Sequence, residues 1–319
     1  MEPETAGDPM TGLKWTRKTT DKISIQLKSV GTTVSSTTVG KILKQLGFSL
    51  KSNVKKISSG GKSMTILEQE KRNSQFEYIN ELRYQSLKEG FPEISIDTKK
   101  KELIGNFKNP GTRYKRVADL TNDHDFLSYG LGKAALYGVY NPVHNNAFVS
   151  IGMFVKEKKT IVSGDTPEFA VESIERWLIN EGVKIFPDIK ELLILADAGG
   201  SNGYRTHMWK VGLQNIICNK YGIKTTVCHF PPGASKWNPI EHKVFSEISK
   251  NWKGVPLIDY ETVLKYTQTT KTEKGLKVNA VLVDKKYTKG MKASKNDLAN
   301  LNIKYHEINP LWNYTISPN

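Results

Sequence analysis

Three acidic residues occupy places where a carboxylate is unusual. Asp97 interrupts a short strand in ISIDTKKKELIG, Asp197 ends an apolar strand in LLILADAGG, and Glu241 begins a helix directly after KWNPI. A carboxylate in a strand buried on both faces is costly unless another group compensates its charge. If the three converge, hard divalent cations such as Mg²⁺ or Mn²⁺ relieve their repulsion. Two such ions about 3.5–4 Å apart suit phosphoryl transfer.

Each acid also has an ordinary structural explanation. Asp197 stands before Ala-Gly-Gly-Ser-Asn-Gly and can cap a turn, and Glu241 can be first-turn charge that the helix dipole favours. Asp97 is harder to explain in this way, because three lysines follow it immediately. The combination with a basic N-terminal segment favours the catalytic interpretation.

The elements that must position these acids alternate between strands and helices from residue 91 onward. Their order is a strand, a hairpin, a helix, a strand, a helix, a strand and a helix, which predicts a mixed sheet with helices on its faces. Chemistry in α/β proteins gathers at the carboxyl edge of the sheet. We therefore expect Asp97 and Asp197 on neighbouring strands, with Glu241 on a helix laid across their ends. The predicted strands are 94–100, 135–140, 147–155, 192–196 and 223–228, and the predicted helices are 166–181, 204–221 and 239–252.

Positive charge is concentrated near the N-terminus. The chain carries 47 Lys and Arg against 32 Asp and Glu, a formal net charge of +15, and residues 11–62 hold eleven basic residues and one acid. A basic segment this dense attracts a polyanion, because neutralising phosphates releases condensed counterions. A solvated basic surface on an ordinary enzyme is the alternative, and the clustering favours nucleic acid.

The same segment has the pattern of a helix-turn-helix. A helix predicted at 21–30 precedes a glycine-containing turn and a second helix, which begins at Ser35 or Ser36 and runs to 46. A small three-helix bundle without DNA-binding function has the same pattern. The predicted apolar faces are Ile23, Ile25 and Leu27 in the first helix and Val39, Ile42, Leu43 and Leu46 in the second. The side chains expected to reach DNA are Ser36, Thr37, Thr38, Lys41 and Lys44.

Changes in composition divide the chain into four segments. Residues 1–62 are the basic helix-turn-helix module with a Ser-Ser-Gly-Gly linker, and residues 63–90 form a connecting helix. Residues 91–254 hold the three acids and are the predicted catalytic domain. Residues 255–319 are lysine-rich with little periodicity, and we expect them to be a C-terminal extension.

Composition argues against several classes of protein. No run approaches the ~18 apolar residues of a membrane span, and the acidic, polar start MEPETAGDPM is unlike a secretory signal. Cys218 and Cys228 are too few for a disulfide framework, so we expect a cytoplasmic protein without a membrane or small-molecule partner. A zinc site from these cysteines with His229 and His242 lacks the paired spacing of such sites and is not expected.

Four strings resemble one known family. DTKKKELIG, ADAGGSNGYR, CHFPPGASKWNPIEH and TKTEKGLKV are similar to the bacterial insertion-sequence transposases of the ISAzo-thirteen family. The resemblance runs from EPETAGDPM to WNYTI, and its motifs are long and unusual. It implies a ribonuclease H-like catalytic domain with a DDE triad, an α/β fold whose mixed sheet is flanked by helices. By position, Asp97, Asp197 and Glu241 match the two aspartates and the glutamate of the family, and the last two are separated by 43 residues.

The chain departs from the family at its start. Members usually carry a further N-terminal helix-turn-helix region before the EPET-like stretch, whereas Met1 falls directly on that stretch here. We therefore expect an N-terminally short chain, in which recognition of the transposon ends is impaired even if the triad is intact.

Basic and aromatic residues near the acids are candidate DNA contacts, each with a structural alternative. Arg205 follows the second aspartate and can hold a phosphate bidentately or form an internal ion pair. Lys236 and Trp237 precede the glutamate, and the indole can stack on a base or pack in the core. A basic loop after the first strand can contact the DNA backbone or form a solvated turn. Its residues are Arg113, Lys115 and Arg116.

The sequence therefore predicts a metal-dependent DDE transposase with two Mg²⁺ or Mn²⁺ ions. Water cleaves a phosphodiester at the transposon end, and the freed 3′-OH attacks target DNA. By analogy we expect a homodimer on DNA. One alternative is a catalytically silent DNA-binding relic or repressor of the parent transposase, which the short N-terminus suggests and the full triad opposes. Another is a ribonuclease H-like nuclease that hydrolyses RNA–DNA hybrids.

Overall fold

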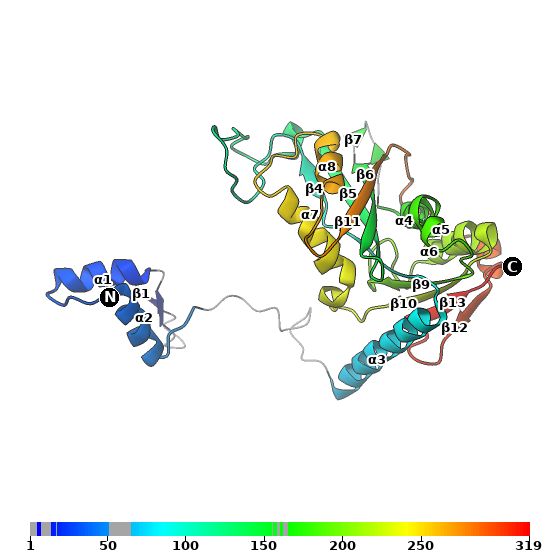
Figure 1. The fold of residues 1–319 in the computed structure, drawn as a ribbon, viewed down its shortest axis with the longest axis horizontal. Coiled ribbons are helices and arrows are strands. Elements are labelled where there is room, and N and C mark those ends of the chain that lie inside the picture. The colour runs from blue at the N-terminus through cyan, green and yellow to red at the C-terminus, as the bar shows by residue number, and fades with distance from the viewer. Residues whose placement is uncertain are drawn as a thin grey trace. The chain divides into compact units, whose positions relative to one another are not determined.

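The structure is a computed structural model that describes residues 5–7, 14–16, 18–50, 65–154, 156–157, 160–161 and 165–319. The chain divides into two units, Met1–Ser63 and Met64–Asn319, each of which is described by itself (Figure 1). The Ser-Ser-Gly-Gly linker lies outside the described residues. Within the described ranges, no helix combines the length and the apolar character needed to cross a membrane.

The N-terminal unit contains the two helices that the sequence predicts. α1 (Thr20–Ser29) and α2 (Ser36–Gln45) follow Thr19 and Ser35, whose hydroxyl oxygens accept hydrogen bonds from backbone N–H groups of the first turn. Gly31, with φ of +88°, lies in the connection between the helices. Its left-handed conformation is one that glycine adopts without strain. The unit also has the antiparallel strands β1 (Thr5–Gly7) and β2 (Lys14–Thr16).

The apolar faces predicted for these helices are buried only in part. Ile23 and Val39 are each 3% exposed, whereas Ile25 and Leu46 are 68% and 66% exposed. The prediction was wrong for Ile25 because residues two apart in an α-helix do not share a face. Ile42 and Leu46 are exposed because the described residues of this unit include no third helix to cover them.

The C-terminal unit is built on a nine-stranded mixed sheet. Its main path runs β11-β6-β5-β3-β9-β10-β13-β12, and β4 pairs with the start of β5. A separate short pair consists of β7 (Lys156–Glu157) and β8 (Thr160–Ile161). The strands of the sheet are β3 (Glu93–Thr98), β4 (Glu102–Ile104), β5 (Gly132–Asn141), β6 (Asn146–Phe154), β9 (Glu191–Ala196), β10 (Lys224–His229), β11 (Lys277–Val283), β12 (Ile303–Tyr305) and β13 (Asn313–Ile316).

Five neighbouring strands of this sheet carry the ribonuclease H-like topology. β3, β5, β6, β9 and β10 lie in the spatial order β6-β5-β3-β9-β10, and among them only β5 runs opposite to the others. A hairpin joins β5 to β6, and parallel strands are reached through helices, as parallel pairing requires. The predicted fold class, a mixed sheet flanked by helices, is confirmed.

Helices cover both faces of the sheet (Figure 1). α4, α6 and η4 pack on one face, against Ile94 and Ile194 among others, while α3 packs on the other face against Leu193 and Leu195. α7 and α8 lie on the α3 side, over β5, β6 and β11. The helices and helical turns are α3 (Ile66–Glu89), η2 (Leu127–Tyr129), α4 (Pro167–Trp177), η3 (Leu178–Gly182), α5 (Val183–Ile185), α6 (His207–Gly212), η4 (Leu213–Asn219), η5 (Ser235–Trp237), η6 (Glu241–Phe245), α7 (Ser246–Asn251), α8 (Tyr260–Gln268) and α9 (Lys295–Ala299).

Residues 255–319, predicted to be an extension, contribute strands to the same sheet. β11 adds to β6 at one edge, and β13 and β12 add to β10 at the other. Both additions belong to the unit that holds β3 and β9. The strand β11 was missed because a seven-residue run with Lys277 and Asn279 in it gives a weak periodic signal in a lysine-rich segment.

A buried amide pair fastens α3 to the last strand. Gln75 Nε2 donates to Asn313 Oδ1 and Asn313 Nδ2 donates to Gln75 Oε1, both at 2.7 Å. Gln75 Nε2 also donates to the backbone oxygen of His229 at 2.9 Å. Both amides are fully buried, so loss of either one leaves the other with polar atoms that water does not reach.

We predict that Gln75→Ala and Asn313→Ala each lower the free energy of unfolding by about 2–3 kcal/mol, because each leaves a buried amide without its partner. The double variant should lose less than the sum, since the second change removes the orphaned group. Urea unfolding followed by circular dichroism measures these losses. Gln85→Ala, on the exposed side of the same helix, is the control and should stay within about 0.5 kcal/mol. Strictly additive losses would contradict the coupling.

Candidate active site

The ends of two parallel strands place Asp97 beside Asp197. In the register of β3 and β9, Ile96 pairs with Ala196, so the two aspartates follow at the same edge of the sheet. Both side chains are half-buried. The aspartates therefore lie on neighbouring strands, where the strand pattern predicts them.

A buried polar network brings the third acid to this edge. Asn238, which is fully buried, donates from Nδ2 to Asp197 Oδ1 at 3.0 Å. Its Oδ1 accepts from Ser95 Oγ at 2.5 Å, and Ser95 Oγ accepts from the backbone N–H of Ile240 at 3.1 Å. Glu241 is the next residue and begins η6. The same side chains that fix Asp197 thus fix the start of the helix that carries Glu241.

Gly138 allows that helix to approach the sheet closely. It pairs with Asp97 across β3 and β5, and a Cβ at this position would lie 2.6 Å from Ile240 Cδ1 and 2.9 Å from Phe245 Cε1. A side chain here would therefore force the side chains of Ile240 and Phe245 to move. Sequence reasoning missed both Gly138 and Ser95. Counting two residues back from Asp97 would have placed Ser95 on the same face of the strand.

The three carboxyl groups crowd one another. Burial, the charge of Asp197 and a hydrogen bond to Glu241 raise the pKa of Asp97 to about 9, although the Thr98 N–H, which donates to Asp97 Oδ1 at 2.7 Å, opposes the rise. Burial also raises the pKa of Asp197, against the effect of its hydrogen bond from Asn238. At neutral pH the Asp97 carboxyl therefore keeps its proton when no cation compensates the cluster.

The lysines that follow Asp97 do not neutralise the cluster. Lys99 pairs with Glu102, and Lys101 pairs with Asp165 at 2.8 Å. Among the ion pairs of the described residues, none involves any of the three clustered carboxyls. No ion pair among the described residues therefore balances the negative charge of these carboxyl groups.

The donor set suits a divalent cation, although it is not arranged as a cage. Crowded carboxylate oxygens are the ligands that Mg²⁺ and Mn²⁺ prefer. In the part of the chain that the structure describes, no group of three or more His, Cys, Asp or Glu side chains is disposed to hold a metal ion. In this structure the carboxyl groups of Asp97 and Glu241 interact with each other.

A pocket of about 610 Å³ opens beside Asp197. The glycine-rich loop 198–206 contributes most of its lining, and residues 231–233 contribute the rest. Arg205 lines this pocket and is exposed, with its guanidinium 5.1 Å from the centre of the Tyr204 ring. The structure therefore brings Arg205 to the neighbourhood of the acids.

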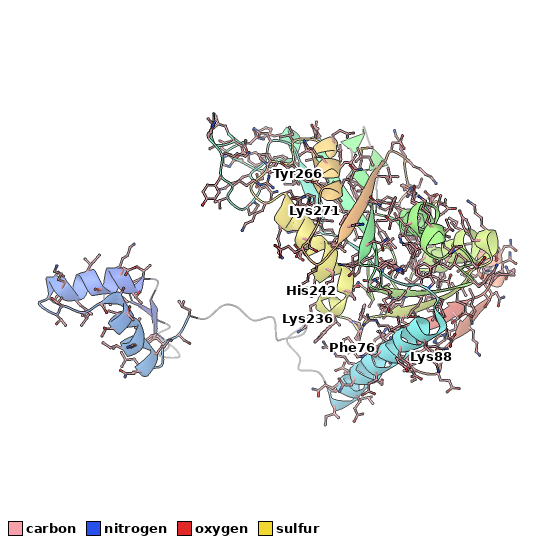
Figure 2. All side chains as sticks on the ribbon, viewed as in Figure 1. Phe76, Lys88, Lys236, His242, Tyr266 and Lys271 are labelled. Atoms are coloured by element: carbon pink, nitrogen blue, oxygen red, sulfur yellow. The ribbon has the colours of Figure 1, made fainter. Side chains whose placement is uncertain are left out.

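The segment before Glu241 carries an exposed aromatic residue and an exposed basic residue. Trp237 is 57% exposed, and its ring meets that of Phe76 edge-on with the centroids 5.9 Å apart. Lys236 lies over the Trp237 ring at 5.3 Å, and its backbone oxygen accepts from His242 Nε2. Lys236 and His242 come from the chain around η6 and Phe76 from α3, as the labels in Figure 2 show. The indole packs on α3 and still keeps more than half of its surface open.

The three basic residues of the loop after β4 have different surroundings. Arg113 donates to the backbone oxygen of Lys253 at 2.8 Å and to that of Asn251, so its guanidinium fastens the loop to the end of α7. Lys115 pairs with the aspartate four residues on, and Arg116 is exposed. Of the three, only Arg116 presents its charge to solvent without an ion pair or hydrogen bond to the described residues.

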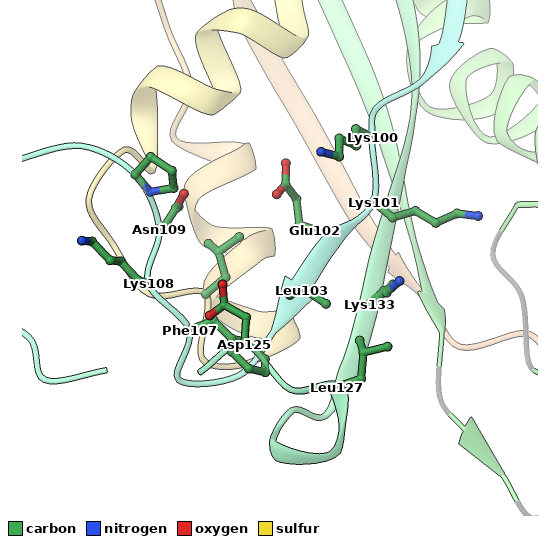
Figure 3. A pocket seen from close by; sticks show the side chains of 12 residues that line it. Lys100, Lys101, Glu102, Leu103, Phe107, Lys108, Asn109, Asp125, Leu127 and Lys133 are labelled. Carbon is green, nitrogen blue, oxygen red and sulfur yellow. The ribbon is translucent and has the colours of Figure 1, made fainter. Parts of the chain in front are cut away.

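A second pocket, of about 420 Å³, lies beside β4 and does not include the three acids (Figure 3). Leu103, Phe107 and Leu127 form part of its apolar lining. Lys100 and Lys108 line it as well. Of the three lysines after Asp97, Lys100 is the exposed one. Lys101 also lines the pocket, and Lys99 and Lys101 are held in ion pairs.

The cysteines are buried and free. Cys218 Sγ donates to Thr225 Oγ1 at 3.5 Å, and burial raises the pKa of this thiol to about 11. Burial also raises the pKa of the Cys228 thiol. Both groups are thiols rather than thiolates at neutral pH, which does not suit a zinc site.

Comparison with known proteins identifies the family of the chain. The family model described as the Rhodopirellula transposase DDE domain matches residues 1–318. The chain belongs to this family. No curated protein matches it.

Solved structures of Mos1 transposase are similar to this transposase-family chain. They include a paired-end complex with the left transposon end, at 14% identity and a TM-score of 0.46, and a mariner paired-end complex with Mn, at 14% identity and a TM-score of 0.45. Each match covers 78% of this chain and 65% of the Mos1 chain. The chain thus spans less than two thirds of the length of these Mos1 chains.

The raised pKa of Asp97 predicts how the metal-free transposase-family chain responds to pH. Between the ordinary aspartate value and about 9, the folded state holds a proton that the unfolded state has lost, so stability is full at low pH and falls as pH rises toward 9. Asp97→Asn removes this fall, and at pH 8–9 in EDTA it should raise the Tm by about 2–4 °C for each kcal/mol gained.

Thermal unfolding at pH 5, 7 and 9 measures this effect. Asp188→Asn, a change at an exposed aspartate, is the matched control and should follow the profile of the unmodified chain. Parallel profiles for Asp97→Asn and the unmodified chain would show that Asp97 does not carry the proton.

Proposed function

We propose that the chain catalyses DNA cleavage and strand transfer in the transposition of an insertion sequence. The observation that carries the proposal is the meeting of Asp97, Asp197 and Glu241 at one sheet edge, in a chain of the transposase DDE family. Water cleaves a phosphodiester at the transposon end and frees a 3′-OH, which then attacks a phosphodiester of target DNA. One P–O bond breaks and one forms in each step, so no high-energy cofactor is required.

The proposed cofactor is Mg²⁺ or Mn²⁺, in two positions. When bound, such ions activate the attacking oxygen and stabilise the leaving oxygen. Asp97, which interacts with both other carboxyl groups, would be one ligand of these ions, and Asp197 and Glu241 would supply the other carboxylates.

Neighbouring groups of the chain hold these ligands ready. The Thr98 N–H fixes Asp97 Oδ1, and Asn238 Nδ2 fixes Asp197 Oδ1, so each aspartate is oriented through one of its oxygens. Asp97 must give up its proton to become a ligand, and cation binding near neutral pH should therefore release a proton.

The proposed DNA contacts lie in both units and are considered separately. Near the acids, Arg205 and Lys236 supply positive charge, and Trp237 supplies an open aromatic face on which a base can stack. In the N-terminal unit, α2 carries along its length the polar and basic side chains that the sequence predicts to reach DNA. Thr37, Thr38, Lys41 and Lys44 are exposed there, and Ser36 is half-buried.

Transposition requires two ends to be held together. We therefore infer that the active form is a homodimer assembled on DNA. Sedimentation of the chain with and without a duplex that carries the element's ends tests this inference.

Asp97→Asn, Asp197→Asn and Glu241→Gln should each reduce metal-dependent cleavage of end DNA by at least about 100–1,000-fold, because each removes a charge that the reaction needs. DNA binding should stay within a few-fold, since none of these carboxylates attracts phosphate. Cleavage and strand transfer are measured on labelled oligonucleotides with Mg²⁺ or Mn²⁺. Glu77→Gln and Asp188→Asn, both at exposed positions, are matched controls and should keep full activity.

The products of the same assay separate the alternatives. Strand transfer products from the unmodified chain support the transposase. DNA binding without cleavage would point to a silent DNA-binding relic, and hydrolysis of RNA–DNA hybrids without strand transfer would point to a ribonuclease H-like nuclease. Unimpaired strand transfer by Asp97→Asn would end the proposal.

Lys41→Ala and Lys44→Ala should weaken binding of the full chain to end DNA and to random DNA alike. The slope of log K against log salt is negative, and each lost phosphate contact reduces its magnitude by about 0.9. Fluorescence anisotropy between 50 and 200 mM salt measures the slope, and Gln45→Ala on the same helix is the neutral control. An unchanged slope in both lysine variants would remove α2 from the DNA interface.

A further inference from the structure

The backbone ladder between β9 and β10 stops one residue before the carbonyl of Asp197. Ala196 pairs with His229 in the register, and the N–H of Phe230 donates to the Ala196 oxygen at 2.8 Å. Within the described ranges, the next carbonyl, that of Asp197, receives no backbone donor. A side chain takes this role, since His229 Nδ1 lies 2.9 Å from the Asp197 oxygen.

The hydrogen bonds around His229 determine its tautomer. A carbonyl oxygen only accepts, so Nδ1 carries the proton and donates to Asp197. His229 Nε2 lies 3.3 Å from the Tyr314 hydroxyl, and that hydroxyl oxygen accepts from Trp209 Nε1 at 3.0 Å. Because the indole only donates, the Tyr314 hydroxyl is free to donate its proton to His229 Nε2. Trp209, Tyr314 and His229 then form a hydrogen-bonded series that ends at the Asp197 carbonyl, and each of its polar side-chain atoms has a partner.

The series is held rigidly. His229, Tyr314 and Trp209 are each fully buried, and Gln75 binds the backbone oxygen of His229 at 2.9 Å. The imidazole is therefore held by Tyr314 of β13, which Trp209 of α6 holds in turn, and the backbone of His229 is held by Gln75 of α3. Asn202 Nδ2 also approaches the Asp197 carbonyl, but at 3.5 Å it is at the outer limit of a hydrogen bond.

We propose that His229 is a positioning residue of the active site, which holds the Asp197 backbone so that its carboxylate meets that of Asp97. His229 contacts the main chain of Asp197 and not its carboxylate, so it acts through the aspartate. The inference rests on the proposed function, because it assigns a metal-ligand role to Asp197. Substitution of a residue that orients a metal ligand typically lowers metal affinity or activity by 10–100-fold.

Two substitutions of similar polarity separate this role from a merely structural one. In His229→Asn the side-chain Nδ2 occupies the place of Nδ1 and retains the bond to the Asp197 carbonyl, while the contact with Tyr314 is lost. In His229→Gln the side-chain amide reaches the place of Nε2 and retains the contact with Tyr314, while the bond to Asp197 is lost. Each variant gives up one buried hydrogen bond, so similar losses of Tm are expected.

The direct readout is the binding of Mn²⁺ to the full chain by titration calorimetry, with the Tm of each variant measured in EDTA. We expect His229→Asn to bind Mn²⁺ within about threefold of the unmodified chain and His229→Gln to bind about tenfold more weakly or worse. His306→Gln is the matched control. His306 bonds to Tyr78 and Thr315 away from the acids, so this change should lower the Tm and leave the Mn²⁺ affinity unchanged.

Equal Mn²⁺ affinity in His229→Asn and His229→Gln, or affinity losses that follow the Tm across all three variants, would overturn the proposal. A second measurement needs neither substitution nor metal. The ¹⁵N spectrum of the histidine-labelled chain should show His229 in the Nδ1–H tautomer, and an Nε2–H tautomer would also overturn it.

The two proposals fail in different ways. If the unmodified chain binds no Mn²⁺, the proposed metal chemistry fails and the positioning role falls with it. If the unmodified chain binds Mn²⁺ and the two variants do not differ, only the role of His229 fails.

Discussion

Uncompensated negative charge at one sheet edge is the constraint on which the rest of the site depends. Protein interiors avoid such charge, because desolvation and mutual repulsion both oppose it. Here Asp97 keeps a proton with a pKa of about 9, while the lysines beside it are held by Glu102 and Asp165. This state of the edge is unfavourable for stability, and in the proposed function a divalent cation would relieve it.

The fold supports this edge by satisfying the polar groups behind it. On one side, Ser95 and Asn238 continue the hydrogen bonding where the β3 strand meets the start of η6. On the other side, His229 takes over where the ladder of β9 and β10 ends. Gly138 supplies the close approach that η6 requires. A large sheet with both faces covered thus stabilises an edge that is itself unfavourable, as is common where function and stability conflict.

Local sequence patterns predicted the strands and the acids at their ends, whereas contacts between residues far apart in the chain could not be predicted. Apolar runs that end in Asp97 and Asp197 indicate parallel strands, and parallel strands end at the same edge. The partners of Ser95 and His229 lie 143 and 32 residues away, and no periodicity signals such contacts. Helical periodicity also predicts an apolar face without saying what covers it, which is why the exposure of the apolar residues of α2 was not foreseen. The internal contacts of Arg113 are hidden from sequence for the same reason.

The most direct test of the central claim is a crystal of the chain soaked in Mn²⁺ and measured at the manganese absorption edge. The account predicts anomalous peaks about 2 Å from carboxylate oxygens of Asp97 and Asp197, with Glu241 completing a second position. It also predicts that the hydrogen bond between Asp97 and Glu241 is broken in that crystal. Saturating Mn²⁺ with no peak at this edge, or carboxylates paired instead with lysine or arginine, would contradict it.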